Sequence, residues 1–277
     1  AVYGLEPGEY TIYADAPKGG KYIDYTGRPL TIGDDGQADV ENPDGFDLTL
    51  LPAKVISGPV YLPDGVAVPE GGIYGRVDAW NDNGTSENGD DDLYFSSDLR
   101  IGEGDSSAGY SILVPVLDEG YRIYVRVRGY GLADSVVLYG GENGSVFTVA
   151  EAEKIDLSAG GLPEKTDADI TLAEGIPVSG EITLPEAAPP GGRLIVIHAF
   201  ADKNTQDIND DIDATVKIMI EEGYDSVPYT IRVPAAEGYR VHYWADPADG
   251  YEDGGFYGIN GETVFDYSRA GVLDLST

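Results

Sequence analysis

Hydrophobic and polar side chains alternate along several short stretches of the chain. In the clearest stretch, residues 121–128, Tyr121, Ile123, Val125 and Val127 alternate with Arg122, Tyr124, Arg126 and Arg128. Residues 55–63, VISGPVYLP, keep the same period and place on one face Ile56, Gly58, Val60 and Leu62. A period of two sends alternate side chains to opposite faces of a β-strand. Because clusters of Gly, Pro and Asp separate these stretches, the pattern predicts an all-β fold of antiparallel sandwiches.

The chain also repeats its own sequence. VISGPVYLP (55–63) recurs as PVSGEITLP (177–185), YSILVP (110–115) as YTIRVP (229–234), EGYRIY (119–124) as EGYRVH (237–242), and IDLS (155–158) as LDLS (273–276). The spacing drifts only from 122 residues (55 to 177) to 118 (155 to 273). Tandem copies of one β-sandwich explain such ordered similarity.

A third copy is partial. FDLTLLPAKVISG (46–58) parallels ADITLAEGIPVSG (168–180), and GEYTIYAD (8–15) matches the EGYRIY position. The repeats predict that residues 1–50 are the second half of a unit, that 51–172 form a complete unit, and that 173–277 form a unit without its last strand. The alternative for both ends is that the chain is cut from a longer tandem array.

The alternation also predicts a core. We expect inward-facing side chains at Val60, Leu62, Ile112, Val114, Ile123 and Val125, with counterparts at Ile182, Leu184, Ile231, Val233, Val241 and Tyr243. Trp80 and Phe200 recur at one position and are interpreted as core residues. Only two stretches admit a helical interpretation, residues 210–222 and 149–154.

The segment GLEPGEYTIYA (4–14) resembles the Gly-Leu-x-Pro-Gly-x-Tyr signature of Cna-B-type and carboxypeptidase-regulatory-like domains. VISGPVYLPDG and VSGEITLPEA resemble the first strand of the same domains. The resemblance implies transthyretin/Ig-like sandwiches that serve as stalks, spacers or adhesins on bacterial surface proteins. Some members of these families form a Lys–Asn isopeptide bond. Here Lys54 lies near a first strand but its counterpart is Ile176, so no such bond is predicted.

The net charge of the chain limits the classes of molecule that it is expected to bind. Fifty Asp and Glu against 17 Lys and Arg give a formal charge of −33. Such a field repels nucleic acid and anionic membrane surfaces, and no run of eighteen apolar residues predicts membrane insertion. The chain has no Cys, so disulfides and thiolate chemistry are excluded.

Two acidic loops occupy the same place in successive units, residues 81–92 and 201–213. Clustered carboxylates suit Ca²⁺, which prefers oxygen ligands. The candidate metal ligands are Asp82, Asp90, Asp91 and Asp92 in the first loop, and Asp202, Asp207, Asp210, Asp211 and Asp213 in the second. The alternative is a solvated acidic loop in an acidic protein.

A second set of candidates is aromatic. The polar side of the strand that contains EGYR carries, in successive units, Tyr13, Tyr124, and His242 with Trp244. Exposed rings can stack on sugars or pack on a neighbouring subunit. The alternative is burial under an adjacent loop. No catalytic site is predicted, because neither a nucleophile motif nor a phosphate loop occurs.

These observations predict a non-enzymatic, secreted or cell-surface structural protein that forms a stalk, fibre or adhesive array. Its partners would be copies of itself or neighbouring repeats, joined head-to-tail by strand complementation. The alternative is a carbohydrate-binding accessory module, with glycans as partners.

Overall fold

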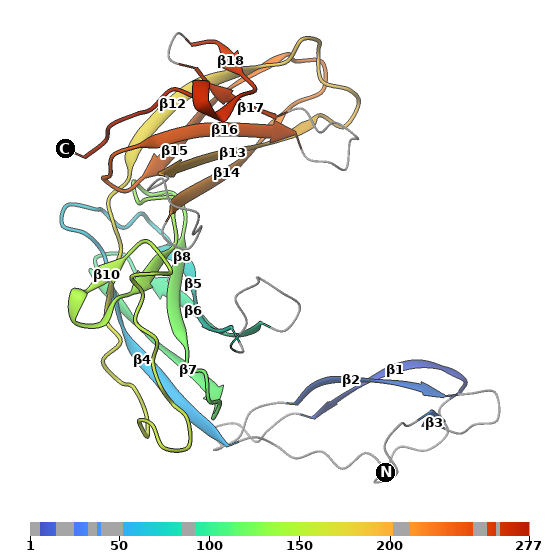
Figure 1. Ribbon diagram of the computed structural model, residues 1–277, viewed down its shortest axis with the longest axis vertical. Coiled ribbons are helices and arrows are strands. Elements are labelled where there is room, and N and C mark those ends of the chain that lie inside the picture. Colours follow the sequence, from blue (N-terminus) through green and yellow to red (C-terminus); the bar gives the residue numbers. More distant parts are fainter. Residues whose placement is uncertain are drawn as a thin grey trace.

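The computed structural model describes residues 6–14, 25–32, 38–39, 52–82, 84, 92–201, 211–245, 254–258 and 261–276, and its elements are strands apart from two short 3₁₀ turns. The N-terminal segment forms a separate three-stranded sheet of β1 (Gly8–Ala14), β2 (Tyr25–Ile32) and β3 (Ala38–Asp39), with order β1-β2-β3 (Figure 1). Among the described residues no helix is long and apolar enough to cross a membrane.

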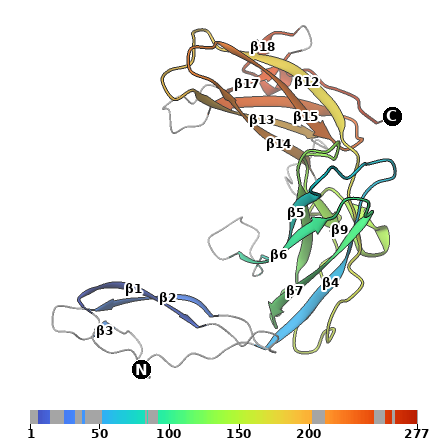
Figure 2. The ribbon, with the colours of Figure 1, turned by 180° about the vertical axis from the view of Figure 1, so that it is seen from behind.

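The middle unit is a sandwich of two sheets. Its strands are β4 (Ala53–Tyr61), β5 (Ile73–Asn81), β6 (Leu93–Ile101), β7 (Ser107–Pro115), β8 (Arg122–Val127), β9 (Val137–Tyr139), β10 (Ser145–Val146) and β11 (Ile170–Thr171). The larger sheet has the order β10-β9-β8-β5-β6 and the smaller sheet β11-β4-β7 (Figure 2). All pairings are antiparallel except that of β11 with β4.

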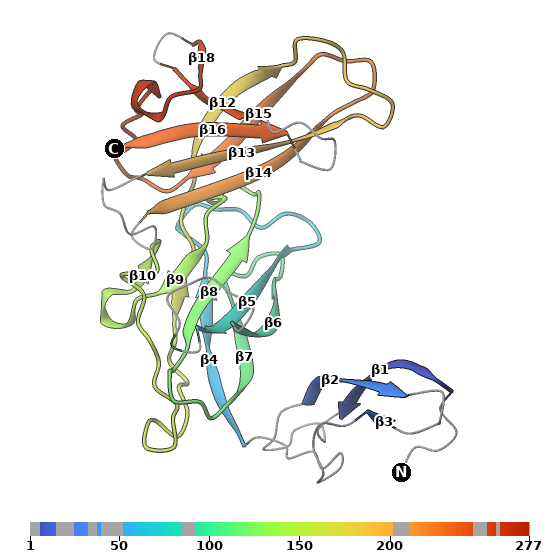
Figure 3. The ribbon, with the colours of Figure 1, turned by 45° about the vertical axis from the view of Figure 1, so that its right-hand side comes forward.

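The C-terminal unit repeats this architecture. Its strands are β12 (Ile176–Thr183), β13 (Arg193–Ala201), β14 (Ile212–Ile220), β15 (Ser226–Val233), β16 (Tyr239–Ala245), β17 (Gly254–Tyr257) and β18 (Thr263–Val264). The larger sheet has the order β14-β13-β16-β17-β18, and the smaller sheet contains β12 and β15 (Figure 3). The predicted all-β sandwich fold is therefore confirmed. The seven strands β12 to β18 correspond, in chain order, to the strands β4 to β10 of the middle unit.

The predicted core of the middle unit is confirmed, because all six inward-facing side chains are buried. In the C-terminal unit Ile231, Val233 and Val241 are also buried. The other three, Ile182, Leu184 and Tyr243, pack against the core but stay partly exposed.

Two interpretations of the sequence are wrong. Residues 212–220 form strand β14 and residues 149–154 form turns, so neither stretch is helical. Trp80 and Phe200 do not point into the core, since their neighbours Ala79 and Ala199 do. Trp80 instead lies under Arg122, whose guanidinium carbon is 5.4 Å from the centre of the indole ring.

One tyrosine anchors each unit. Tyr121 and Tyr239 are fully buried, and their hydroxyls donate to the carbonyls of Pro115 at 2.8 Å and Pro234 at 3.0 Å. A buried phenol needs such an acceptor, because an unpaired hydroxyl in the core costs free energy. These bonds tie the start of β8 and of β16 to the strand that precedes each.

The smaller sheets differ in one strand. In the middle unit residues 165–172 run along β4 and end in β11, which pairs Ile170 with Val60. Gly58 allows this approach, because a Cβ atom there would lie 2.4 Å from the carbonyl oxygen of Ala168. Among the described residues no strand lies on the corresponding edge of β12.

We predict that Gly58→Ala destabilises the middle unit by about 1–3 kcal/mol, because the added methyl group would displace the backbone at Ala168. Urea denaturation would measure the loss. Gly109→Ala is the control, since a Cβ atom there meets nothing within 4 Å. Equal stability of the two variants would contradict the close approach at Gly58.

Candidate functional site

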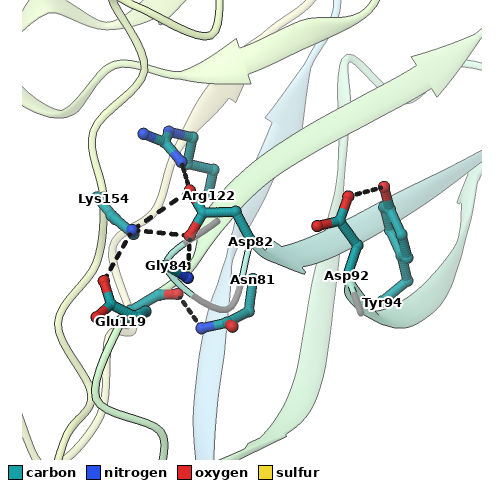
Figure 4. A network of polar contacts seen from close by, with 9 residues as sticks. Asn81, Asp82, Gly84, Asp92, Tyr94, Glu119, Arg122 and Lys154 are labelled. Carbon is teal, nitrogen blue, oxygen red and sulfur yellow. Dashed lines mark hydrogen bonds and ion pairs between the residues drawn. The ribbon is translucent and has the colours of Figure 1, made fainter. Parts of the chain in front are cut away.

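The carboxylate of Asp82 is held by two cations. At the end of β5 its oxygens accept from Arg122 Nη1 at 2.8 Å and from Lys154 Nζ at 3.0 Å (Figure 4). The backbone N–H of Gly84 donates to the same carboxylate at 3.2 Å, and Lys154 also lies 3.5 Å from Glu119. Partial burial raises the pKa of the Asp82 carboxyl, but hydrogen bonds from Lys154 and Arg122 outweigh it and hold the pKa below its usual value.

This pairing changes the prediction of a calcium site in residues 81–92. The charge of Asp82 is already balanced by side chains of the same unit, and a metal ion would have to compete with them. Asp92 accepts a hydrogen bond from the hydroxyl of Tyr94 at 3.2 Å. Asp90 and Asp91 lie outside the described residues, and the described part of the chain holds no group of three or more His, Cys, Asp or Glu arranged to bind a metal.

The second acidic loop is mostly outside the described residues, including Asp202, Asp207 and Asp210. Asp211 directly precedes β14, and Asp213 lies in that strand, paired with Phe200 of β13. One oxygen of Asp213 is 3.6 Å from Nε2 of His198. Calcium binding therefore stays a prediction for both loops.

On the outer face of the middle unit, the candidate Tyr124 belongs to a polar network. Asp78 is buried beside Tyr124, accepts from Arg76 Nε at 2.5 Å and from Ser96 Oγ at 2.6 Å, and lies opposite Tyr124 in the sheet. Burial, with the charge of Asp78, raises the pKa of the Tyr124 hydroxyl to about 12. Arg126 covers the Tyr124 ring at 5.5 Å from its centre. Tyr124 is half-buried, and a role for it in ligand binding or at an interface stays a prediction.

The corresponding face of the C-terminal unit is aromatic. His198 takes the place of Asp78, lies opposite His242 in the sheet, and stacks on Phe200 with ring centres 5.1 Å apart. We call this cluster the aromatic face; it comprises His198, Phe200, His242, Trp244, Phe256 and Tyr267. Its rings are half-buried, except for Tyr267, which is exposed.

The candidates His242 and Trp244 lie in the middle of this face. Their ring centres are 5.2 Å apart, and His242 lies 4.6 Å from Phe256. Burial, together with the nearby His198, lowers the pKa of His242, so the imidazole of His242 is uncharged at neutral pH. Arg240 flanks the face, and its guanidinium carbon lies 4.4 Å from the centre of the Tyr267 ring. Such a surface can stack on a flat apolar ligand face. Tyr13 lies in β1, and its side chain is outside the described residues.

The repeats did not reveal the junction between the two sandwiches. Asp134 N donates to the carbonyl of Arg232 at 2.7 Å, and Arg232 N donates to Asp134 Oδ2 at 2.7 Å. Arg232 Nη1 also donates to the carbonyl of Gly175 at 2.8 Å. Burial raises the pKa of the Asp134 carboxyl, against the opposing hydrogen bond from Arg232 and the charge of Arg128. One feature of the sequence marks this region: residues 129–135 share no identical residue with residues 247–253, which occupy the same place in the C-terminal unit.

No protein-family model and no curated protein sequence matches the chain. Similar solved structures include CBD12 from CALX1.2, with 13% identity over 69% of this chain and 73% of that one, and a TM-score of 0.18. The calcium binding domain CBD12 of CALX1.1 gives 13% identity over the same shares, with a TM-score of 0.17. Similarity at this level supports no inference about the ligand or activity of this chain.

We predict that Asp82→Asn destabilises the middle unit by about 1–3 kcal/mol, because Arg122 and Lys154 lose the charge that pairs them. The stabilisation is complete above the ordinary carboxyl pKa of 3.8 and is lost as the pH falls through the lower folded-state pKa. Urea denaturation should therefore separate the two proteins fully at pH 7 and less at pH 3. Glu103→Gln, at an exposed turn, is the control.

The calcium prediction has its own test. A melting temperature of the wild-type chain that is equal in millimolar Ca²⁺ and in chelator would exclude the calcium site.

Proposed function

We propose that the chain is a non-enzymatic structural protein, secreted or on the cell surface, in which tandem sandwiches form a stalk, fibre or adhesive array. The observation that carries this proposal is the junction between the middle and C-terminal units. A stalk must hold its domains in a fixed relation, and a flexible linker would not do so. Here backbone and side-chain hydrogen bonds replace such a linker.

The junction is a short β-type contact across the unit boundary. Ala133 N donates to the carbonyl of Ala173 at 3.0 Å, and Gly175 N donates to the carbonyl of Gly131 at 2.8 Å. Leu132 is buried beneath it, and a further bridge joins Ser135 to Ala214 of β14. Gly175 has no room for a side chain, because a Cβ atom would lie 2.7 Å from the carbonyl oxygen of Leu132. The fit and the bonds together restrict motion of one unit against the other.

We predict that Arg232→Ala loosens the junction, since it removes the guanidinium bond to Gly175. Small-angle X-ray scattering should show one fixed arrangement of the two units in the wild-type chain and a broader range of dimensions in the variant. Arg269→Ala, at an exposed ion pair with Glu262, is the matched control.

The proposed location has a separate test. Antibodies against the chain should label intact source cells. Flexible units in the wild-type chain, or labelling only after permeabilisation, would refute the proposed role.

A second candidate function is carbohydrate binding, and the aromatic face of the C-terminal unit supports it. Six rings from β13, β16, β17 and the turn Tyr267–Arg269 gather on the side of the sheet that faces away from the core. Aromatic rings on a protein surface can pack against the apolar faces of sugar rings. The equivalent face of the middle unit carries Asp78, Arg76 and Arg126 instead, so any such binding would belong to the C-terminal unit.

We predict that, if the aromatic face binds glycans, Trp244→Ala reduces retention on an insoluble polysaccharide column at least tenfold. The indole supplies a large part of the ring surface. Tyr74→Ala is the control, because Tyr74 is 57% exposed on the middle unit and lies outside the cluster. Wild-type protein that passes unretained through a panel of polysaccharides would remove this candidate.

A further inference from the structure

The outer face of the larger sheet in the middle unit carries a group of arginines. Strand β5 lies between β8 and β6 (Figure 3), and the side chains that point away from the core form rows across these three strands. In one row Arg76 lies between Arg126 and Asp98. In the next row Tyr74 lies opposite Arg100. Directly opposite residues of antiparallel strands have Cβ atoms about 5 Å apart. We call Arg76, Arg100 and Arg126 the arginine cluster.

Arg76 is held in position by its own sheet. Its Nε donates to Asp78 Oδ1 at 2.5 Å, and its Nη2 donates to the hydroxyl of Ser96. The side chain of Arg76 is nevertheless 57% exposed, whereas that of Asp78 is buried. Within the described part of the chain, Nη1 of Arg76 has no hydrogen-bond partner. A guanidinium that is already fixed loses little conformational entropy when it binds an anion.

The other two arginines of the cluster have no ion pair among the residues that the structure describes. Both are exposed, and their guanidinium carbons lie over aromatic rings. Arg100 is 5.3 Å from the centre of the Tyr74 ring, and Arg126 is 5.5 Å from that of Tyr124. Arg126 also lies directly opposite Arg76. Like charges in opposite positions destabilise a sheet, so an anion bound between these two arginines would relieve their repulsion.

The local charges leave a surplus of one positive charge. Asp78 balances Arg76, and Asp98 balances one of the other two arginines. Arg128, which directly follows β8, lies near Asp134 at the junction and is matched there. The chain as a whole carries a formal charge of −33, and such a field repels polyanions. A ligand with a single carboxylate therefore suits the cluster better than a long polyanion does.

The sandwich does not require the arginine cluster in order to fold. In the C-terminal unit the three positions are held by Val196, Trp244 and Met219, at the same places in the strand pairing. The same architecture therefore forms without a cation at any of them. Outward positions of this kind are free to take up a binding role.

The other side chains of this face favour a sugar over an acidic peptide. The outward residues of β5, β6 and β8 are charged, hydroxyl-bearing or aromatic, and none of them is aliphatic. A bound peptide takes much of its affinity from side chains that fill apolar pockets. A sugar instead needs an acceptor for its hydroxyls, such as the exposed Asp98, and an exposed ring for its apolar face, such as Tyr74, which is 57% exposed.

We propose that the arginine cluster binds a carboxylated sugar, whose carboxylate lies between Arg76 and Arg126 and whose ring lies beside Tyr74 and Arg100. The planar guanidinium fork matches the two oxygens of a carboxylate with parallel hydrogen bonds. Uronic acids and sialic acids share this chemistry, since each presents one carboxylate on a sugar ring. The site lies on a different unit from the aromatic face, and it does not depend on the proposed structural role.

The test follows the arginine side chains of the full chain directly. Nuclear magnetic resonance of ¹⁵N-labelled protein records the Nε–H signals of Arg76, Arg100 and Arg126 while sodium glucuronate is added. These signals should shift together and saturate. Glucose and the methyl ester of glucuronate, which lack the charge, should bind about tenfold or more weakly. A second titration with N-acetylneuraminate decides between the two kinds of sugar acid.

Two variants test the assignment to these residues. Arg126→Gln and Arg100→Gln should each reduce the affinity for the sugar acid about tenfold or more, because each removes one cation of the cluster. Arg269→Gln, at an exposed position of the C-terminal unit, is the matched control and should bind as the wild type does. The melting temperature shows that each variant is folded.

Three results would overturn the inference. They are the absence of shifts with both sugar acids, equal affinity for glucuronate and its methyl ester, and unchanged affinity in both arginine variants. Tighter binding of a polyglutamate peptide than of either sugar acid would assign the cluster to an acidic protein partner and would also overturn it. Each of these results leaves the proposed structural role to be decided by the junction between the units.

Discussion

Backbone hydrogen bonding at the outer edge of the smaller sheet is the constraint on which each sandwich depends. In the middle unit this edge is covered by residues 165–172, and the consequence reaches well below the edge itself. Ile56 and Val60 are fully buried there, while their counterparts Val178 and Ile182 are only partly buried. The same strand pairing therefore decides whether the core is closed to solvent. In the described part of the C-terminal unit, the two-stranded sheet β12-β15 is too narrow to cover the core side of the five-stranded sheet.

The two units share a scaffold but present different outer faces. In the middle unit Asp78 and Asp82 are paired with Arg76, Arg122 and Lys154, which gives a rigid, charged surface. In the C-terminal unit the equivalents of Asp78 and Arg126 are His198 and Trp244, and rings replace charges. Because inward positions fix the fold and outward positions are free to vary, one sandwich can serve as a spacer and the next as a contact surface.

The sequence predicted the features that repeat with a period of two. Alternation identified Ile123, Val125 and their counterparts as core residues, because a half-buried sheet requires it. It failed at residues 212–220, where β-branched Ile212, Val216, Ile218 and Ile220 favour a strand and all nine residues pair with β13. The prediction also failed for Trp80 and Phe200, whose recurrence at one position of the repeat suggested burial although they lie on the outer face. No period could indicate Asp134 and Arg232, because their contact joins two units and occurs once.

The long sequence separation of the segment that covers β4 sets the order in which the middle unit can be completed. Ser57 bonds to Lys165, and Val60 pairs with Ile170, so the edge closes only after the rest of the unit has formed. On the ribosome, where the N-terminal part emerges first, strand β4 must wait with its edge open for more than a hundred residues. Contacts of such high sequence separation slow folding and expose an edge to other chains. A nascent middle unit thus passes through a form in which the edge of β4 is open to pairing with other chains, until residues 165–172 have been synthesised.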